Sequence, residues 1–207
     1  GRPAVELGEV VERGRHLLLD VGEVAEDDPL GLGREARLRL HEPILQLREL
    51  VRDMYETMDK APGVGLAAPQ IGVGLRVFTY DYADDDGNER RGVIINPVLE
   101  RGPIVDEPAD EDTEIEGCLS VPGERFPLKR ADWVKISGVD LDQKPVQFEA
   151  DGWFARIFQH EFDHLDGLLY VDRLAEPWHE IAADIIEDNG WGKPGLSWLP
   201  GKDNLEG

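Results

Sequence analysis

Apolar side chains recur at helical spacing in two parts of the chain. From Leu47 to Met58 they lie three or four positions apart, the spacing of an amphipathic helix packed on a core. Pro62 and Gly63 follow, so this helix is predicted to run from about Leu47 to about Lys60. The segment 152–165 has the same period, and its expected inward side chains are Phe154, Ile157, Phe158 and Leu165.

Between these helices the pattern changes to that of strands. Segments 76–80, 93–95, 133–136 and 146–149 are rich in β-branched and aromatic residues, and Asn96-Pro97 is expected to close the second of them. Acidic residues 103–114 are predicted to form a surface loop, and a shorter helix is predicted over 177–187. Strands flanked by helices favour an α+β fold, with antiparallel strands packed around a central helix over 152–165.

The pattern divides the chain into three parts. A main domain is predicted over residues 44–188, because the periodic segments all lie there. Residues 1–43 are rich in charge and show no clear period, so their structure is left open. Residues 189–207 are rich in Gly, Pro and Trp and are expected to be irregular.

The composition is strongly acidic. The 207 residues include 44 Asp and Glu against 22 Lys and Arg, a formal net charge of −22. Such a surface repels phosphate backbones and anionic lipids, so binding of nucleic acid or membranes through a basic patch is not expected. The charge by itself indicates solubility or adaptation to salt, not a particular function.

Cysteine usage and hydropathy indicate a cytoplasmic protein. The single cysteine, Cys118, cannot form a disulfide within the chain, which suits a reducing compartment. No apolar run is long enough to span a membrane, and Leu17 to Leu19 is too short for the core of a signal peptide.

Residues 160–164 read His-Glu-Phe-Asp-His within the second predicted helix. Two histidines four positions apart share one helix face, where both imidazoles can bind one metal ion. Glu161 is rotated by about 100° from His160, which suits a general base beside the metal better than a ligand. The competing interpretation is a helix with an exposed histidine pair.

A catalytic metal of this kind usually has three protein ligands and one position for water. The zinc proteases with H-E-x-x-H-x-x-G-x-x-H use a third histidine, but Tyr170 occupies that position here. Cys118 is the only other soft ligand and therefore the candidate third ligand, together with His160 and His164. A lone cysteine is otherwise most often a small buried apolar residue.

A third segment, Gly63 to Gln70, is rich in small residues. Small residues let a ligand or another backbone approach closely, and the spacing is not that of a phosphate-binding loop. Gln70 is a neutral hydrogen-bonding group that could polarise a carbonyl without adding charge.

Together, residues 63–70, 116–120 and 159–166 resemble the three motifs of peptide deformylase, in the same order. The resemblance covers roughly Arg48 to Leu174, and the tail at 190–200 is similar to that of actinobacterial members. It implies a metal-dependent hydrolase that removes the formyl group from the N-terminal methionine of new polypeptides. It also implies one divalent metal per chain, Fe(II) natively with Zn or Ni possible, held by Cys118, His160 and His164.

The resemblance also assigns the remaining roles. Glu161 would take the proton from water and deliver it to the leaving amine, while Gln70 and the backbone N–H of Leu119 would stabilise the oxyanion. Glu116 would be structural and paired with Arg125 or Arg130. The methionine pocket and the extended peptide would be bound by Val64, Gly65, Gly117, Trp153 and Ile157.

The chain departs from the family at both ends. Residues 1–40 match no known part of a deformylase, which leaves their architecture and role open. Some members reach the ribosome through a basic C-terminal helix, but residues 176–188 are acidic here, so only transient contact with the ribosome is expected. Two alternatives stay open: a general metallopeptidase with another third ligand, and a non-catalytic metal- or peptide-binding module.

Overall fold

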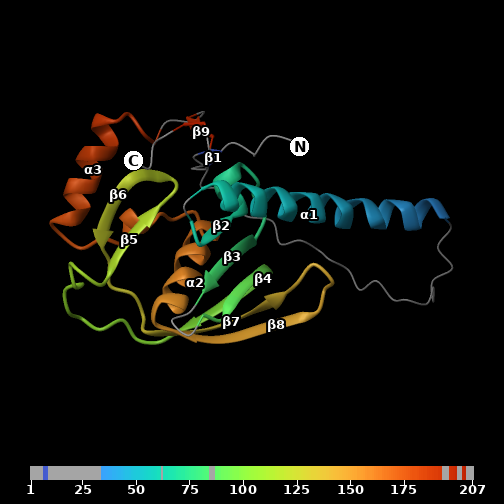
Figure 1. Ribbon diagram of the computed structural model, residues 1–207, viewed down its shortest axis with the longest axis horizontal. Helices are drawn as coiled ribbons and strands as arrows, with labels where there is room; N and C mark the ends of the chain where they lie inside the picture. The colour runs from blue at the N-terminus through green and yellow to red at the C-terminus, as the bar shows by residue number, and fades with distance from the viewer. Residues whose placement is uncertain are drawn as a thin grey trace.

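The computed structural model describes residues 7–8, 34–61, 63–83, 87–192, 196–199 and 202–203. It has an α+β fold, as predicted (Figure 1). The helices are α1 (Arg34–Lys60), α2 (Gly152–Leu165) and α3 (Trp178–Asp188), with short 3-10 turns η1 (Ala68–Ile71) and η2 (Tyr170–Arg173). The strands are β1 (Leu7–Gly8), β2 (Gly65–Ala67), β3 (Val77–Ala83), β4 (Glu89–Arg101), β5 (Ile115–Cys118), β6 (Val121–Pro127), β7 (Trp133–Val139), β8 (Pro145–Asp151) and β9 (Ser197–Trp198).

The largest sheet is antiparallel and has the order β2-β3-β4-β7-β8. Helix α2 packs on it and contacts each of its five strands. The contact is aromatic: Phe154 and Phe158 of α2 lie with ring centroids 4.4 Å apart and meet Phe78, Tyr80 and Phe148 of the sheet. The inward side chains predicted for this helix are all buried, and its bounds match the predicted segment. The sheet thus holds the helix of the His-Glu-x-x-His motif rigidly.

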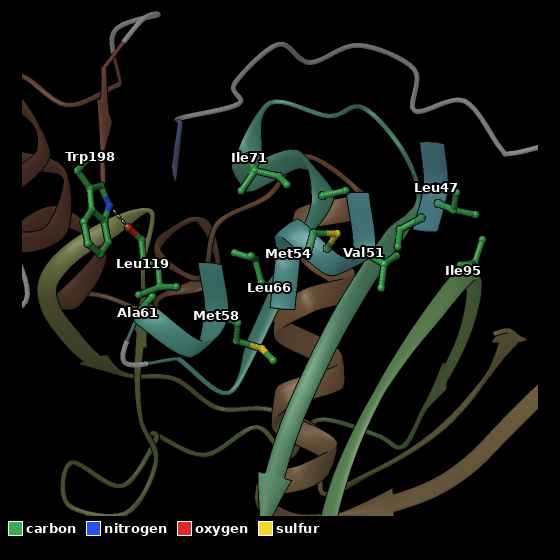
Figure 2. Packing of buried hydrophobic residues seen from close by; sticks show 12 residues of the cluster. Leu47, Val51, Met54, Met58, Ala61, Leu66, Ile71, Ile95, Leu119 and Trp198 are labelled. Carbon is green, nitrogen blue, oxygen red and sulfur yellow. Dashed lines mark hydrogen bonds between the residues drawn. The ribbon is translucent and has the colours of Figure 1, made fainter. Parts of the chain in front are cut away.

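Helix α1 covers a second core cluster. Its stripe of Leu47, Val51, Met54 and Met58 is buried against Leu66, Ile71 and Ile95 (Figure 2). The helix ends at Lys60, as predicted, but it begins at Arg34 and not near Leu47. It continues through Pro43. A proline inside a helix removes one backbone hydrogen bond but does not necessarily end the helix.

Strand β4 is longer than the sequence predicted. It continues through Asn96-Pro97 to Arg101, with a shift of register against β7 between Ile95 and Val98. Asn96 has φ of 49° there. A strand can contain a proline at a β-bulge of this kind, because a residue there need not donate a backbone hydrogen bond to the neighbouring strand.

The two ends of the chain meet in a small sheet. Strand β9 pairs antiparallel with β1, with Leu7 opposite Trp198. The tail is therefore not irregular throughout, since Trp198 is buried in the cluster that α1 covers. The rest of the N-terminal segment, 1–6 and 9–33, and residues 193–195, 200–201 and 204–207 of the tail lie outside the described residues. In the described part of the chain, no helix has the length and apolar character needed to cross a membrane.

Candidate active site and metal centre

Helix α2 brings the two histidines of the motif together. The Nε2 atoms of His160 and His164 are 3.1 Å apart, and their rings are nearly perpendicular, with centroids 4.8 Å apart. One helical turn separates the two residues, so both imidazoles point to the same side of α2. That side faces the β5–β6 hairpin.

Cys118 completes this group from the end of β5. Its Sγ lies 3.3 Å from Nε2 of His164, and the ligand atoms of Cys118, His160 and His164 all lie within 4.8 Å of one another. Among the described residues, no other set of three His, Cys, Asp or Glu side chains meets the same test for a metal site. One thiolate and two imidazoles form a donor set that suits zinc, iron and related divalent ions.

Cys118 and His160 shift each other's pKa towards a thiolate and an imidazolium, so His160 would release a proton on binding a metal. Burial alone would raise the pKa of the Cys118 thiol, but the charges and hydrogen bonds of His164 and His160 bring it well below its ordinary value. Burial would lower the pKa of His160, yet Cys118 and Glu116 raise it well above its ordinary value. The cysteine is therefore favoured as a thiolate, the form that binds metals.

Glu116 holds the imidazole of His160 from behind. Its Oε1 lies 2.7 Å from Nδ1 of His160, which leaves Nε2 to face Cys118 and His164. Arg130 donates to both carboxylate oxygens, at 2.6 and 3.1 Å, and Arg156 donates to Oε2 at 3.0 Å. Burial would raise the pKa of this carboxyl, but His160 and Arg130 hold it well below its usual range.

Only part of this arrangement follows from the sequence. Of the two proposed partners of Glu116, Arg130 is confirmed, whereas Arg125 lies opposite Gly117 in the hairpin. The contact with His160 was missed, although the carboxylate–histidine–metal arrangement is common and orients a metal ligand. Residues 116 and 160 are far apart in the sequence, so no local pattern links them. The only indication was the motif itself, because a histidine that binds a metal often has a carboxylate on its other ring nitrogen.

Glu161 is buried beside the group of Cys118, His160 and His164. Only 4% of it is exposed, its Oε2 has no hydrogen-bond partner, and burial raises the pKa of its carboxyl to about 7. Gly65 of β2 makes room for this side chain, because a Cβ at Gly65 would lie 2.2 Å from Oε1 of Glu161. A desolvated carboxyl that titrates near neutrality can both take up and release a proton at physiological pH.

Gln70 and Leu119 approach the site from two different loops. Gln70 lies in η1, where its Oε1 accepts a hydrogen bond from the Ala67 N–H at 2.9 Å. This bond turns Nε2 towards Ser120 Oγ, at 3.3 Å, and Cys118 Sγ, at 3.8 Å. Leu119 follows Cys118 directly in the hairpin. Both residues line the same cleft as Glu161 and His160.

The cleft also contains the residues predicted to bind the peptide. Ile157 is buried in α2, whereas Val64 and Trp153 are 42% and 43% exposed and form part of the rim. Gly65 and Gly117 line it from β2 and β5. The cleft is also lined by residues that were not predicted to lie there, among them Ile115, Glu124, Arg125 and Arg156. His164 is buried and is not among the lining residues.

The chain matches a known protein family. Residues 34–179, which make up most of the chain, match the model of the polypeptide deformylase family. The chain belongs to the peptide deformylase family. It is therefore a metal-dependent hydrolase that removes the N-formyl group from newly made polypeptides, as the sequence predicted.

Relatives and solved structures agree with the deformylase assignment. The chain is 56% identical to a peptide deformylase of Mycolicibacterium paratuberculosis, over 75% of this chain and 80% of that protein. It is 53% identical to peptide deformylase 2 of Corynebacterium efficiens, over 78% and 84%. A crystal structure of the Ehrlichia chaffeensis deformylase in complex with actinonin aligns with a TM-score of 0.63 at 26% identity, over 91% of this chain and 98% of that one.

Proposed function

We propose that Cys118, His160 and His164 hold the metal of this deformylase, one divalent ion per chain. The observation that carries the proposal is the position of the Cys118 sulfur beside the histidine pair. Tyr170 stands at the sequence position where zinc proteases with this motif have their third histidine, so another ligand is needed. Fe(II) is proposed as the native metal, with Zn or Ni as substitutes, because one thiolate and two imidazoles accept all three. When bound, such an ion supplies Lewis acidity and lowers the pKa of a coordinated water.

Glu161 is the proposed proton carrier. It sits one residue from His160 in α2, and its pKa near 7 allows it to take a proton from water and later give it to the leaving amine. The lack of a partner for Oε2 supports this role, because that oxygen is available to a reacting group.

Gln70 and the backbone N–H of Leu119 are the proposed oxyanion donors. Attack on the formyl carbon places negative charge on its oxygen, and fixed donors stabilise that charge without having to reorient. The bond from Ala67 N–H to Oε1 fixes which end of the Gln70 amide faces the sulfur. Each donor is expected to contribute about 3–4 kcal/mol to stabilising the transition state.

The substrate is proposed to bind as an extra strand. Within the described residues, β2 pairs only with β3 and β5 pairs only with β6, so each has an unpaired edge. An extended N-formylmethionyl peptide could pair its backbone with Gly65 and Gly117, while Ile157, Val64 and Trp153 receive the methionine side chain. Backbone pairing of this kind does not depend on the sequence of the nascent chain, so selectivity would come from the methionine pocket.

We place this activity in the cytoplasm, where formylated nascent chains are made, and expect only transient contact with the ribosome. Helix α3 carries Glu180, Asp184, Glu187 and Asp188, which does not favour docking on RNA through that helix. No direct sequence-specific recognition of nucleic acid is proposed.

The test is deformylation of formyl-Met-Ala-Ser under anaerobic conditions with protein loaded with Fe(II) or Ni(II). Cys118→Ala and Glu161→Ala should each lose activity by ~100-fold or more, as expected for loss of a metal ligand or of a general base. His179→Ala, a histidine on α3 outside the cleft, is the matched control and should retain wild-type activity. Full activity in either site variant would contradict the proposed roles, and cleavage of unformylated Met-Ala-Ser would favour a general metallopeptidase.

A further inference from the structure

The carbonyl oxygen of Leu119 accepts a hydrogen bond from the far end of the chain. The donor is the indole Nε1 of Trp198, 2.9 Å away, in strand β9 (Figure 2). The indole is 9% exposed and packs in the cluster that contains Leu119, Met58 and Ala61. An indole nitrogen can only donate, so this bond has a fixed direction, from the tail to the turn that follows Cys118.

The same peptide group contacts the sulfur of Cys118 at its other end. The carbonyl carbon of Leu119 is bonded to the nitrogen of Ser120, and the Ser120 N–H donates to Cys118 Sγ at 3.4 Å. A continuous path therefore runs from the Trp198 indole through one peptide group to the sulfur. A hydrogen bond accepted by a carbonyl polarises its amide and strengthens the N–H as a donor.

We propose that Trp198 is a positioning residue for the deformylase reaction, which orients and strengthens the Ser120 N–H···S hydrogen bond to the Cys118 thiolate. The inference rests on the proposed role of Cys118 as a metal ligand. Hydrogen bonds to a sulfur ligand draw electron density from it, and such outer contacts tune both metal affinity and reactivity. The tail thereby controls the electronic character of the site without touching substrate or metal.

The strand that carries Trp198 is held in place by a second segment. Strand β9 pairs with β1 near the start of the chain, and β1 also contacts η1, the turn that carries Gln70. The turn with Leu119 and the turn with Gln70 are thus supported by the same small sheet. The pairing of β1 with β9 would therefore support the active-site turns in addition to placing Trp198 in the core cluster.

The test uses Co(II)-loaded protein, because a thiolate bound to Co(II) gives a charge-transfer absorption band that reports electron density on sulfur. Trp198→Phe keeps an aromatic ring but removes the donor. It should shift this band to longer wavelength, because the sulfur regains the electron density that the hydrogen bond draws from it. Trp198→Leu, a second replacement without a donor, should give the same shift and serves if the Phe variant does not fold.

Two controls separate the hydrogen bond from packing and from the substitution itself. Met54→Ala creates a void in the same cluster, from α1, and should lower the melting temperature while leaving the band unmoved. Trp133→Phe makes the same chemical change on β7, at a residue outside the cleft, and should leave both unchanged.

The outcomes distinguish this inference from the proposed function. A band at the wild-type position in the Trp198 variants would overturn the positioning role, even if their activity fell. A shift in Met54→Ala equal to that in Trp198→Phe would also overturn it, because packing alone would then explain the effect. A charge-transfer band that survived in Cys118→Ser would instead contradict the proposed ligand set.

Discussion

At the scale of single residues, Glu161 is the site of a conflict between stability and function. Its Oε2 is the one buried side-chain nitrogen or oxygen in the described part of the chain that has no hydrogen-bond partner. Burying a carboxylate in this way costs free energy, and the raised pKa of the group records that cost. The same environment brings its pKa close to the pH at which it would work as a base.

Replacing Glu161 by Gln should therefore stabilise the metal-free protein while abolishing its activity. The folded carboxyl has a pKa of about 7 against an ordinary value of 4.5, so the folded state favours the protonated form. Its contribution to stability is fully present below the ordinary pKa and is lost as the pH rises through about 7. At pH ~8, Glu161→Gln should raise the free energy of unfolding by about 1–3 kcal/mol, and the gain should shrink towards pH ~5.

Thermal unfolding of the chelated protein at both pH values measures this effect. Glu107→Gln, an exposed carboxylate in the loop before β5, is the matched control and should show no such dependence. If the Glu161→Gln variant is less stable than wild type at the higher pH, the account of Glu161 is contradicted.

Glu116 presents the opposite case, a buried carboxylate with several partners. Removal of its charge by Glu116→Gln leaves Arg130 and Arg156 without their shared anion, which should cost about 3–5 kcal/mol of stability at neutral pH. Because the folded pKa of Glu116 lies below its ordinary value, its contribution is present above about 4.5 and is lost as the pH falls further.

Urea unfolding at pH ~7 and in acid tests this expectation, since the difference between wild type and the Glu116→Gln variant should decrease once the wild-type carboxyl is protonated. The same variant should bind metal about 10–100-fold more weakly, because His160 loses the group that orients it. A loss of stability under ~1 kcal/mol at neutral pH would show that the arginines find other partners.

At the scale of elements, the active site depends on the close approach of β2 to α2. Gly65→Ala would place a methyl group 2.2 Å from Oε1 of Glu161 and would displace the carboxylate. We expect kcat to fall by at least ~10-fold, as for other small displacements of catalytic groups, with a smaller effect on global stability. Gly74→Ala, at a glycine whose added Cβ would meet no atom within 4 Å, is the control for the loss of glycine itself. Equal kinetics in the two variants would rule out the steric role of Gly65.

Long elements with a strong period could be predicted, whereas short elements could not. The bounds of α2 follow from the spacing of Phe154, Phe158 and Leu165. Because His160 and His164 are four residues apart in this helix, the sequence also predicted that they share one face. Strands β2 and β5 were missed because they have only three and four residues. Strand β6 was missed because its seven residues include two prolines, a glycine and two charged residues, so its pairing is decided by the rest of the fold. The contacts of Glu116 and Trp198 were missed for a related reason, since they join segments that share no local pattern.

At the scale of the whole molecule, acidic charge exceeds basic charge by 22. Like charges on a compact surface repel one another, and salt screens that repulsion. The charge excess does not depend on the active site, so its effect should be visible in catalytically inactive variants as well.

The melting temperature of the chelated protein should therefore rise when NaCl is increased from ~0.05 to ~0.5 M, because screening of the net charge outweighs the loss of exposed ion pairs such as Arg48–Asp142. Differential scanning calorimetry measures this effect, and Glu161→Gln serves as an inactive comparison. A melting temperature that falls with added salt would show that surface ion pairs contribute more than the net repulsion removes.

The proposed metal centre joins the β5–β6 hairpin to helix α2, and its ligand set is the central claim of the account. X-ray absorption at the metal edge of the Fe(II)- or Zn(II)-loaded protein measures that set directly. For zinc we expect one sulfur at about 2.3 Å and two imidazole nitrogens at about 2.0–2.1 Å, with the sulfur shell absent in Cys118→Ser. A metal bound only by nitrogen and oxygen in the wild type, or a sulfur shell that persists in the variant, would contradict the assignment of Cys118, His160 and His164.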